Sequence, residues 1–428
     1  MRIAMVSEHA SPLAALGGVD SGGQNVHVDQ LARALGRAGH EVTVYTRRDD
    51  EELPDRVRTA GGVVVEHLEA GPAEPLPKDD LLPYVSDLGA ALAARLAADP
   101  PDLVHAHFWM SGLAALAATR SADMPGLPVV QTFHALGVTK RRFHGRHDTS
   151  PAARIRMERA LGRDVNAVIA TSSEEIAELV RIGVPRERIS MVPCGVDVDE
   201  FTADGPAAER GARPRVLSLG RLVPRKGYDT VIRAMAAVPD AELIIAGGPA
   251  AGELAGDREA RRLTQLAQRL GVADRVRLVG AVPRPDVPAL LRSADVVVCA
   301  PWYEPFGLVP LEAMACGVPV IATAVGGLVD TVVDGATGVL VPPRRPDALA
   351  AAMRRMLSEP FWREAFGAAG VDRARSRYTW DRVAADTVVV YARVLAAADP
   401  HAELDALDAL DTGDAEEAAD GAATPVTR

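Results

Sequence analysis

The sequence is poor in the residues that mark several common protein classes. Its three cysteines, Cys194, Cys299 and Cys316, are widely spaced in a chain of 428 residues. This spacing predicts neither a disulfide framework nor a metal-binding cluster, and it favours a cytoplasmic protein. No apolar run approaches the ~18 residues that a transmembrane helix needs, and the N-terminus lacks the pattern of a signal peptide. We therefore expect no integral membrane segment.

An excess of basic residues is also missing. The net charge of −11 depends largely on residues 399–428, which hold nine acids and one Arg, whereas the rest of the chain carries 49 acids and 46 bases. A body with so balanced a charge offers no general nucleic-acid footprint, so small molecules are the expected partners. The Ala- and Asp-rich terminal segment has little to bury, and we expect a disordered acidic tail.

Short β-branched runs alternate with amphipathic helical stretches along the whole chain. Continuous apolar strands separated by helices predict parallel sheets covered on both faces. The pattern is interrupted once, at a segment rich in Asp, Gly, Pro and Arg. The prediction is an α/β protein with two doubly wound Rossmann-like domains that face a central cleft. Its parts are a first domain at 1–193, a linker at 194–214, a second domain at 215–379 and a crossing helix at 380–398.

The stretch "SLGRLVPRKGYDT", residues 218–230, places two basic residues where a strand ends and a helix begins. Helix N-termini normally favour acids because of the helix dipole. Arg221 and Lys226 at this place therefore indicate a bound anion, and a phosphate or diphosphate fits best. The alternative is a pair of solvated surface bases.

A glycine-rich turn precedes the first helix, in "VDSGGQNVHV" at residues 19–28. Ser21, Gly22 and Gly23 leave backbone N–H groups open to a phosphate or a sugar. The spacing differs from the G-x-G-x-x-G dinucleotide fingerprint, which disfavours an NAD-linked dehydrogenase.

The stretch "APWYEPFGLVPLEAMACGVPVIAT", residues 300–323, holds two carboxylates around the turn into an apolar helix. Gly307 shapes a loop whose amides lead into a helix that is expected to begin near Leu308, which makes a second anion site. Glu304 can accept hydrogen bonds from sugar hydroxyls, and Glu312 faces the same loop from inside the helix. The alternatives are a solvated loop acid and a helical acid paired with a base.

Histidines and two isolated bases complete the candidate residues of the first domain. His105, His107 and His134 fall at the ends of neighbouring strands, where hydrogen-bonding histidines of a polar cleft are favoured over a zinc site. Lys78 and Arg154, each near a helix start, are candidates for an anionic acceptor group. Each alone is also compatible with a plain surface base.

Together and in this order, these motifs resemble the retaining GT-B glycosyltransferases of family 4. The resemblance covers residues 1 to about 397 and is carried by "EPFGLVPLE", "GVPVIATAVGG", "GRLVPRKG" and "SGGQNVHV". It implies that Arg221 and Lys226 neutralise the diphosphate of a nucleotide-sugar donor, helped by backbone amides. It further implies that Glu304 binds the transferred sugar, that Glu312 binds the ribose, and that His134 lies beside the reacting sugar.

The full set of site residues follows from this resemblance. The implied catalytic residues are His134, Arg221, Lys226 and Glu304, and the implied donor site adds Gly23, Phe306, Gly307, Leu308, Val309 and Glu312, with Gly326 and Gly327 nearby. No metal and no cofactor are implied. The expected reaction is transfer of a hexosyl group to a hydroxyl of a small acceptor with retention of configuration.

Within the family, the first domain resembles two branches, the sucrose and sucrose-phosphate synthases and the D-inositol-3-phosphate glycosyltransferases. Matching the second branch implies acceptor contacts at Asn25, Lys78, Phe108, Ala135 and Arg154. Phe108 and Ala135 stand where that branch has Tyr and Thr, which removes two hydroxyl donors from a phosphate site. The sugar phosphate, cyclitol or natural-product acceptor therefore stays open.

Two other functions are weighed against this one. A nucleotide-sugar epimerase of the same architecture would need acid and base residues placed for proton abstraction. A non-catalytic nucleotide-sugar-binding protein would be expected to have lost part of the set Arg221, Lys226, Glu304 and Glu312, all of which are present. The sequence leaves the donor nucleotide undecided and leaves a homodimer open.

Overall fold

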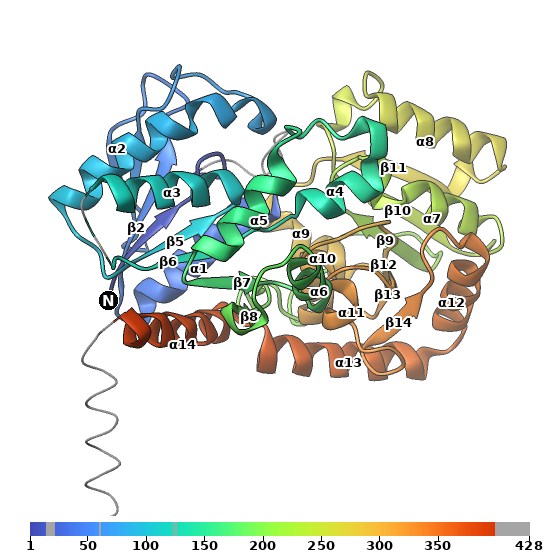
Figure 1. The fold of residues 1–428 in the computed structure, drawn as a ribbon. Helices are drawn as coiled ribbons and strands as arrows, with labels where there is room; N and C mark the ends of the chain where they lie inside the picture. Colours follow the sequence, from blue (N-terminus) through green and yellow to red (C-terminus); the bar gives the residue numbers. More distant parts are fainter. Residues whose placement is uncertain (14–21, 60, 123, 125, 399–428) are drawn as a thin grey trace, which may run out of the picture.

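The computed structural model shows two α/β domains, each built on one twisted sheet with helices on both faces (Figure 1). It describes residues 1–13, 22–59, 61–122, 124 and 126–398. Ser21 and the acidic tail therefore lie outside the described residues. Among the described helices, none is both long enough and apolar enough to cross a membrane.

The first domain is organised on a sheet whose described strands follow the order β3-β4-β2-β1-β5-β6-β7-β8. All neighbours pair in parallel except β3 and β4 at one edge, which are antiparallel. The bounds are β1 Arg2–Val6, β2 Glu41–Arg47, β3 Arg56–Arg58, β4 Val64–Leu68, β5 Leu103–His107, β6 Val129–Thr132, β7 Ala167–Ala170 and β8 Ile189–Met191.

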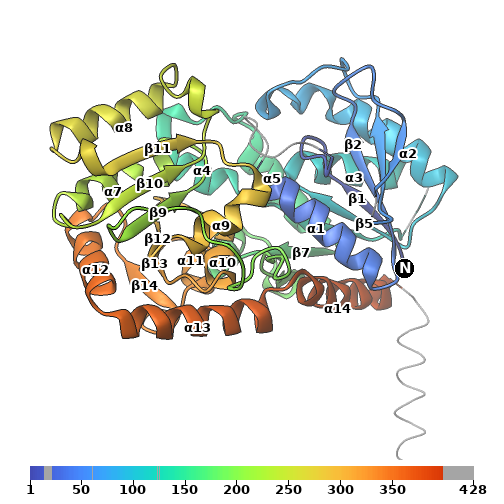
Figure 2. The ribbon, with the colours of Figure 1, turned by 180° about the vertical axis from the view of Figure 1, so that it is seen from behind.

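Helices cover both faces of this sheet because its central strands are apolar on both sides. One face packs against α2, α3, α5 and α6 around Trp109, and the other packs against α1 and α14 around Tyr391. Figure 2 shows α1 in front of the sheet with α14 below it. The bounds are α1 Gly23–Arg37, α2 Val85–Ala98, α3 Trp109–Ser121, α4 Gly137–His144, α5 Arg154–Asp164, α6 Ser173–Arg181 and α14 Trp380–Ala398.

The second domain has a wholly parallel sheet in the order β11-β10-β9-β12-β13-β14. Helices α7, α8 and α12 cover one face, and α9, α10, α11 and α13 cover the other. The strands are β9 Arg215–Leu219, β10 Glu242–Ala246, β11 Val276–Gly280, β12 Val296–Cys299, β13 Val320–Thr323 and β14 Gly338–Val341. The helices are α7 Tyr228–Met235, α8 Arg258–Arg269, α9 Val287–Arg292, α10 Leu308–Ala315, α11 Leu328–Thr331, α12 Pro346–Ser358 and α13 Pro360–Arg377.

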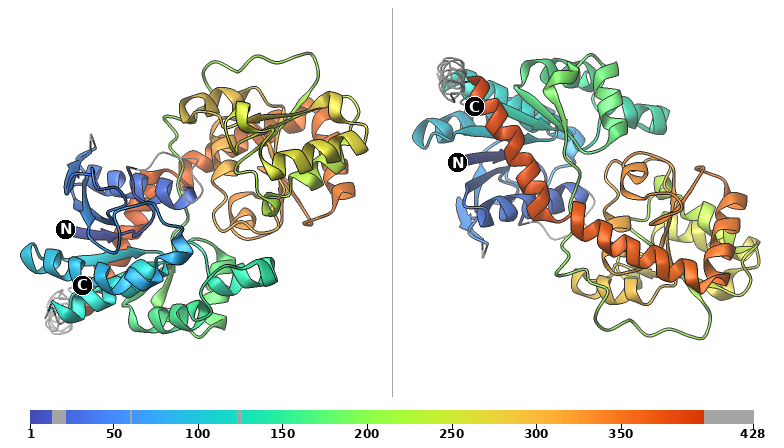
Figure 3. Two further views of the ribbon diagram at one scale, coloured as in Figure 1. Left: turned by 90° about the horizontal axis from the view of Figure 1, so that it is seen from above. Right: turned by 90° about the horizontal axis from the view of Figure 1, so that it is seen from below.

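The described chain passes between the domains at two places, through residues 192–214 and again between α13 and α14. These two crossings lie side by side, since Val196 forms a parallel bridge with Thr379 and its amide donates to the carbonyl of Tyr378 at 2.7 Å. Figure 3 shows α13 under the second domain and α14 running on under the first. Helix α14 thus follows the second crossing and covers one face of the first sheet.

The two-domain α/β architecture predicted from the sequence is confirmed. The short β-branched runs of the sequence form strands of the two sheets, as in Arg215–Leu219 and Val296–Cys299 of the second sheet. The prediction missed β3, because Arg56–Arg58 holds one apolar residue between two arginines. The exact domain boundaries stay predictions.

Candidate active site

One large cavity lies between the two domains, with a volume of about 770 Å³, a size typical of ligand sites. Its walls come from the carboxyl ends of β1, β5 and β6 with the start of α1, and from the ends of β9 and β12 with the start of α10. Most residues predicted for the site line it: Gly23, Lys78, Phe108, His134, Ala135, Arg154, Arg221, Lys226, Glu304, Phe306, Gly307, Leu308 and Val309.

The loop between β9 and α7 carries the basic residues of the second domain's wall. Gly227 ends its short 3₁₀ turn in the left-handed conformation, with φ of 70°. A Cβ at this residue would lie 2.0 Å from the carbonyl oxygen of Ala300, so only glycine lets the loop approach the end of β12 so closely. The loop thus brings Arg225 and Lys226 against residues 302–304.

Lys226 and Glu304, which are 78 positions apart, form an ion pair in this wall. The side chain of Glu304 is only 12% exposed, and Arg225 lies 3.7 Å from the same carboxylate oxygen. Burial by itself would raise the pKa of Glu304, but the charges of Lys226 and Arg225 outweigh it and hold the pKa below its usual value. The carboxylate is therefore ionised at neutral pH and accepts hydrogen bonds.

The loop after β12 aims the start of α10 at the cavity. Gly307 has φ of 83° and begins the helix, and Leu308 and Val309 form its first turn. The first amides of a helix have no acceptor within the helix, and together with its dipole they favour an anion. The basic loop and this helix start therefore place positive charge around one part of the cavity.

The start of α1 faces this loop from the first domain. A Cβ at Gly23 would lie 3.3 Å from the Phe306 ring, so the glycine allows a close approach of the two domains.

Asn25, predicted as an acceptor residue, is not among the described residues of the cavity wall. Its side chain accepts from the amide of Gly22 at 3.0 Å and donates to the carbonyl of Ser11 at 3.1 Å. Asn25 thus shapes the loop around Gly22 and Gly23.

Glu312 is also absent from the described wall. It is buried in α10 and accepts from Arg284 at 2.6 Å, while Arg284 also binds Glu200 at 2.9 Å. Burial raises the pKa of the Glu312 carboxyl, and the nearby Arg284 guanidinium opposes that rise. The predicted helical acid is therefore paired with a base, and its role in binding a ribose stays a prediction.

Arg154 lines the acceptor side of the cavity, yet its side chain is only 2% exposed. It donates to Glu158 at 2.7 Å and to the carbonyl of Ala135 at 2.6 Å. Its guanidinium lies over the Phe108 ring, 5.0 Å from the ring centroid. Because of these contacts, Arg154 is held within the wall and organises Phe108 and Ala135.

Four histidines of the first domain form a buried row behind the cavity. His107 Nδ1 lies 2.9 Å from His134 Nε2, and His105 bonds Tyr391 of α14 at 2.7 Å. Burial lowers the pKa of His27 to about 4 and that of His105 to about 3, and it lowers those of His107 and His134 well below the usual value. All four rings are therefore neutral at pH 7.

Among the described residues, no group of three or more His, Cys, Asp and Glu is placed to hold a metal ion. Of the four histidines, His134 lines the cavity, and it has the left-handed backbone that non-glycine residues rarely adopt, with φ of 62°. Phe108 also has a positive φ, of 79°. Such strain is found mostly at functional sites.

Several residues of the wall were not predicted. Lys140 on α4 is paired with Asp79 at 3.1 Å, and His9 follows β1 and is bonded to Glu8 at 2.8 Å. Arg225 could have been found beside Lys226 in "PRKG", whereas Lys140 is paired with Asp79 from 61 positions away, and the sequence gave no signal for that pair. Cys299 lines the cavity too, but burial raises its pKa to about 12, so its thiol is no nucleophile.

The cavity thus joins a positively charged wall and an ionised carboxylate with a wall of neutral imidazole and aromatic rings. Two facing Rossmann-like domains with this cleft define the GT-B architecture of glycosyltransferases. Residues 21–200 match the profile of Glycosyltransferase Family 4, and residues 200–373 match that of Glycosyl transferases group 1. The chain belongs to glycosyltransferase family 4.

Similar proteins are known along almost the whole chain. D-inositol 3-phosphate glycosyltransferase 2 of Catenulispora acidiphila is 37% identical, over 92% of this chain and 95% of its own. The D-inositol 3-phosphate glycosyltransferase of Kineococcus radiotolerans is 38% identical, with the same coverage. Among solved structures, sucrose-phosphate synthase from Thermosynechococcus elongatus has a TM-score of 0.83 and 34% identity, over 92% of this chain and 99% of that one. Anabaena Alr3699/HepE, solved with UDP-glucose, shares the fold at 21% identity, with a TM-score of 0.69 over 91% of this chain and 99% of its own.

Proposed function

We propose that this protein is a retaining hexosyltransferase, which moves a hexosyl group from a nucleotide-diphosphate sugar to a hydroxyl of a small acceptor. The observation that carries the proposal is the ion pair of Lys226 and the ionised Glu304 beside the start of α10, in a cavity lined by both domains. A diphosphate needs fixed positive charge, and a sugar needs a buried hydrogen-bond acceptor. Both lie within one wall.

In this proposal the second domain holds the donor. Arg221 and Lys226, together with the amides of Leu308 and Val309, receive the diphosphate and stabilise its negative charge as the glycosidic bond breaks. Glu304 accepts hydrogen bonds from hydroxyls of the transferred sugar. When the diphosphate attracts Lys226, the Glu304 oxygens become available to these hydroxyls.

The first domain holds the acceptor in this proposal. His134 lies beside the reacting sugar, and Lys78, Phe108, Ala135 and Lys140 line the space beyond it. The curated relatives are named for D-inositol 3-phosphate, which makes this cyclitol phosphate the first acceptor to test. Phe108 and Ala135 offer no side-chain hydroxyl, so neutral cyclitols and sugars belong in the same panel.

The deciding experiment is a screen of UDP-, GDP- and ADP-sugars by nucleotide release, crossed with sugar phosphates, cyclitols and small natural products. We expect one donor to release nucleotide in a manner that depends on an acceptor, and the product to keep the anomeric configuration of the donor by NMR. An inverted product would contradict retention. Conversion of the donor to its epimer without an acceptor would instead favour the epimerase.

We further propose that the transfer needs no metal, because Arg221, Lys226 and the α10 start supply positive charge where a divalent ion would otherwise be needed. Activity is expected to stay the same after treatment with EDTA and after addition of Mg²⁺ or Mn²⁺. An enzyme that lost its activity to EDTA and recovered it with one of these ions would contradict this part of the proposal.

A further inference from the structure

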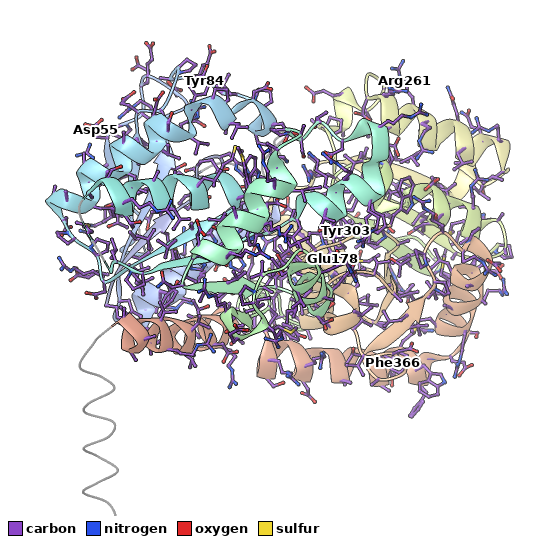
Figure 4. The ribbon with its side chains drawn as sticks, viewed as in Figure 1. Asp55, Tyr84, Glu178, Arg261, Tyr303 and Phe366 are labelled. Carbon is purple, nitrogen blue, oxygen red and sulfur yellow. The ribbon has the colours of Figure 1, made fainter. Side chains whose placement is uncertain are left out.

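A second contact zone joins the domains beside the cavity, between α6 of the first domain and the residues after β13 of the second. The carboxylate of Glu174, in the first turn of α6, accepts from the amide of Gly326 at 2.6 Å. Next to it, the amide and hydroxyl of Ser173 donate to Asp330 of α11 at 2.8 and 3.1 Å. Figure 4 shows Tyr303 and Glu178, from the two domains, near each other at this zone, and both line one small pocket there.

The glycine pair that Glu174 contacts supports the backbone of the proposed sugar-binding residue. The amide of Gly327 donates to the carbonyl of Glu304 at 2.9 Å. A Cβ at Gly326 would lie 2.0 Å from that same carbonyl oxygen, and one at Gly327 would lie 2.7 Å from the carbonyl oxygens of Pro305 and Phe306. The turn at 326–327 therefore packs directly on residues 304–306, with no side chain between them.

A chain of contacts thus runs from the first domain to the donor wall. Glu174 holds the amide of Gly326, the adjacent Gly327 holds the carbonyl of Glu304, and the Glu304 carboxylate pairs with Lys226. A second contact fixes the same loop, since the rings of Phe143 on α4 and Tyr303 stack at 5.3 Å with an angle of 11° between their planes. Tyr303 is therefore held by Phe143 of the first domain. Glu304 and Phe306, on either side of Pro305, contact the turn at 326–327, which Glu174 of the first domain holds.

We propose that Glu174 is a positioning residue, which sets the place of Glu304 in the donor site when the two domains are in contact. The inference rests on the proposed function and extends it, because it makes the geometry of the sugar site depend on a residue of the acceptor domain. Arg221 and Lys226 depend on it less, because the loop after β9 carries them, and not the loop at 304–306 on which the turn at 326–327 packs.

Three variants separate this role from a merely structural one. Glu174→Ala removes the acceptor for the Gly326 amide, whereas Glu174→Gln keeps an oxygen in its place. Asp330→Ala is the matched control, because it breaks the Ser173 contact in the same zone and leaves the bond to Gly326 intact. The readouts are hydrogen exchange of the backbone at residues 324–328, turnover with the donor found by the screen, and affinity for UDP, or for GDP or ADP if the screen selects that donor.

Loss of a hydrogen bond to a charged acceptor is expected to speed exchange at 324–328 and to lower kcat by about 10- to 100-fold in Glu174→Ala. Affinity for the nucleoside diphosphate should change by less than about twofold, since Arg221 and Lys226 are carried by the separate loop after β9. Glu174→Gln should recover most of the turnover, and Asp330→Ala should stay within about threefold of the wild-type kcat, because a lone polar contact of this kind contributes little.

Three results would overturn the positioning role: an unchanged kcat in Glu174→Ala, an equal loss in Asp330→Ala, or a loss of diphosphate affinity as large as the loss of kcat. A wild-type protein that releases nucleotide from no donor would overturn the proposed function, and the positioning role with it. Hydrogen exchange needs no substrate, so it shows separately whether Glu174 holds the turn at 326–327. These failures can therefore be told apart.

Discussion

At the scale of single residues, Lys226 and Glu304 stabilise each other inside the cavity wall. Each side chain is mostly buried, at 17% and 12% exposed, and a buried charge without its partner is costly. The depressed pKa of Glu304 means that the pair stabilises the fold above the usual pKa of a carboxyl group. This stabilisation is lost as the pH falls through the lower, folded-state value. The ion pair of these two residues, both proposed for catalysis, thus also contributes to the stability of the fold.

Lys226→Met is expected to reduce turnover by orders of magnitude and to lower the free energy of unfolding by about 3 kcal/mol, since Glu304 keeps only the weaker interactions with Arg225 and Arg221. The double variant Lys226→Met/Glu304→Gln should regain most of that stability and none of the turnover. Urea denaturation and nucleotide release measure the two effects. A double variant as unstable as the single one would show that the ion pair is not the cause.

The sequence predicted which residues line the site better than it predicted their partners. Arg221, Lys226 and Glu304 were placed by their positions at strand ends, because parallel strands bring these ends to one edge of a sheet. The pairing of Glu312 with Arg284 could not be predicted. It depends on how a short 3₁₀ turn meets α10, and no periodicity encodes that contact.

At the scale of elements, the turns after β9 and β13 depend on glycine for two separate reasons. Gly227 and Gly326 have positive φ, and each also lies against a carbonyl oxygen of the loop after β12. By contrast, Gly62 has a similar φ of 82° and no atom near the position of a Cβ. The energetic cost of the positive φ can therefore be measured separately from the cost of a Cβ that clashes with a neighbouring carbonyl.

Gly62→Ala is expected to cost about 1 kcal/mol, the usual penalty of a left-handed alanine. Gly227→Ala should cost considerably more and should also lower turnover, because its Cβ would lie 2.0 Å from the Ala300 oxygen and displace the loop that carries Lys226. Thermal unfolding of both variants, with Gly252→Ala as an unstrained control, gives the comparison. Equal losses for Gly62→Ala and Gly227→Ala would mean that packing at Gly227 is unimportant.

Strands could be predicted from the sequence where the apolar residues of one face or of both faces form a simple repeating pattern. Strands such as Val320–Thr323 are buried throughout and can be predicted from their apolar composition alone. β3 does not, because it is a short edge strand held by its antiparallel pairing with β4 and not by apolar burial.

At the scale of the whole molecule, the C-terminal helix α14 completes the core of the first domain. Tyr391 bonds His105, and the Trp380 ring meets the edge of His27 with ring centroids 5.4 Å apart. These imidazoles are fully buried beneath the helix and remain neutral, since burial disfavours their charged form. We therefore expect the packing of α14 against the first domain to become less stable in acid.

Stability is expected to fall as the pH drops from 7 to 5.5, because the unfolded chain binds protons at histidines that stay neutral in the folded protein. With folded-state pKa values of about 4 for His27 and about 3 for His105, each costs about 1 kcal/mol at pH 5.5. Urea denaturation across this range measures the slope. His27→Phe should make the slope shallower, because it removes one of these histidines, and an unchanged slope in that variant would contradict the assignment.

The adjacency of the two interdomain crossings has a mechanical consequence. Val196 is hydrogen-bonded to Tyr378 and bridged to Thr379. Because of these contacts, we expect the two connections to bend together, as one hinge. Relative motion of the domains is then expected to be mainly a rotation about one hinge axis. A rotation about this axis that separated the domains would part Glu174 from Gly326, so opening of the cavity and release of the turn at 326–327 would be coupled.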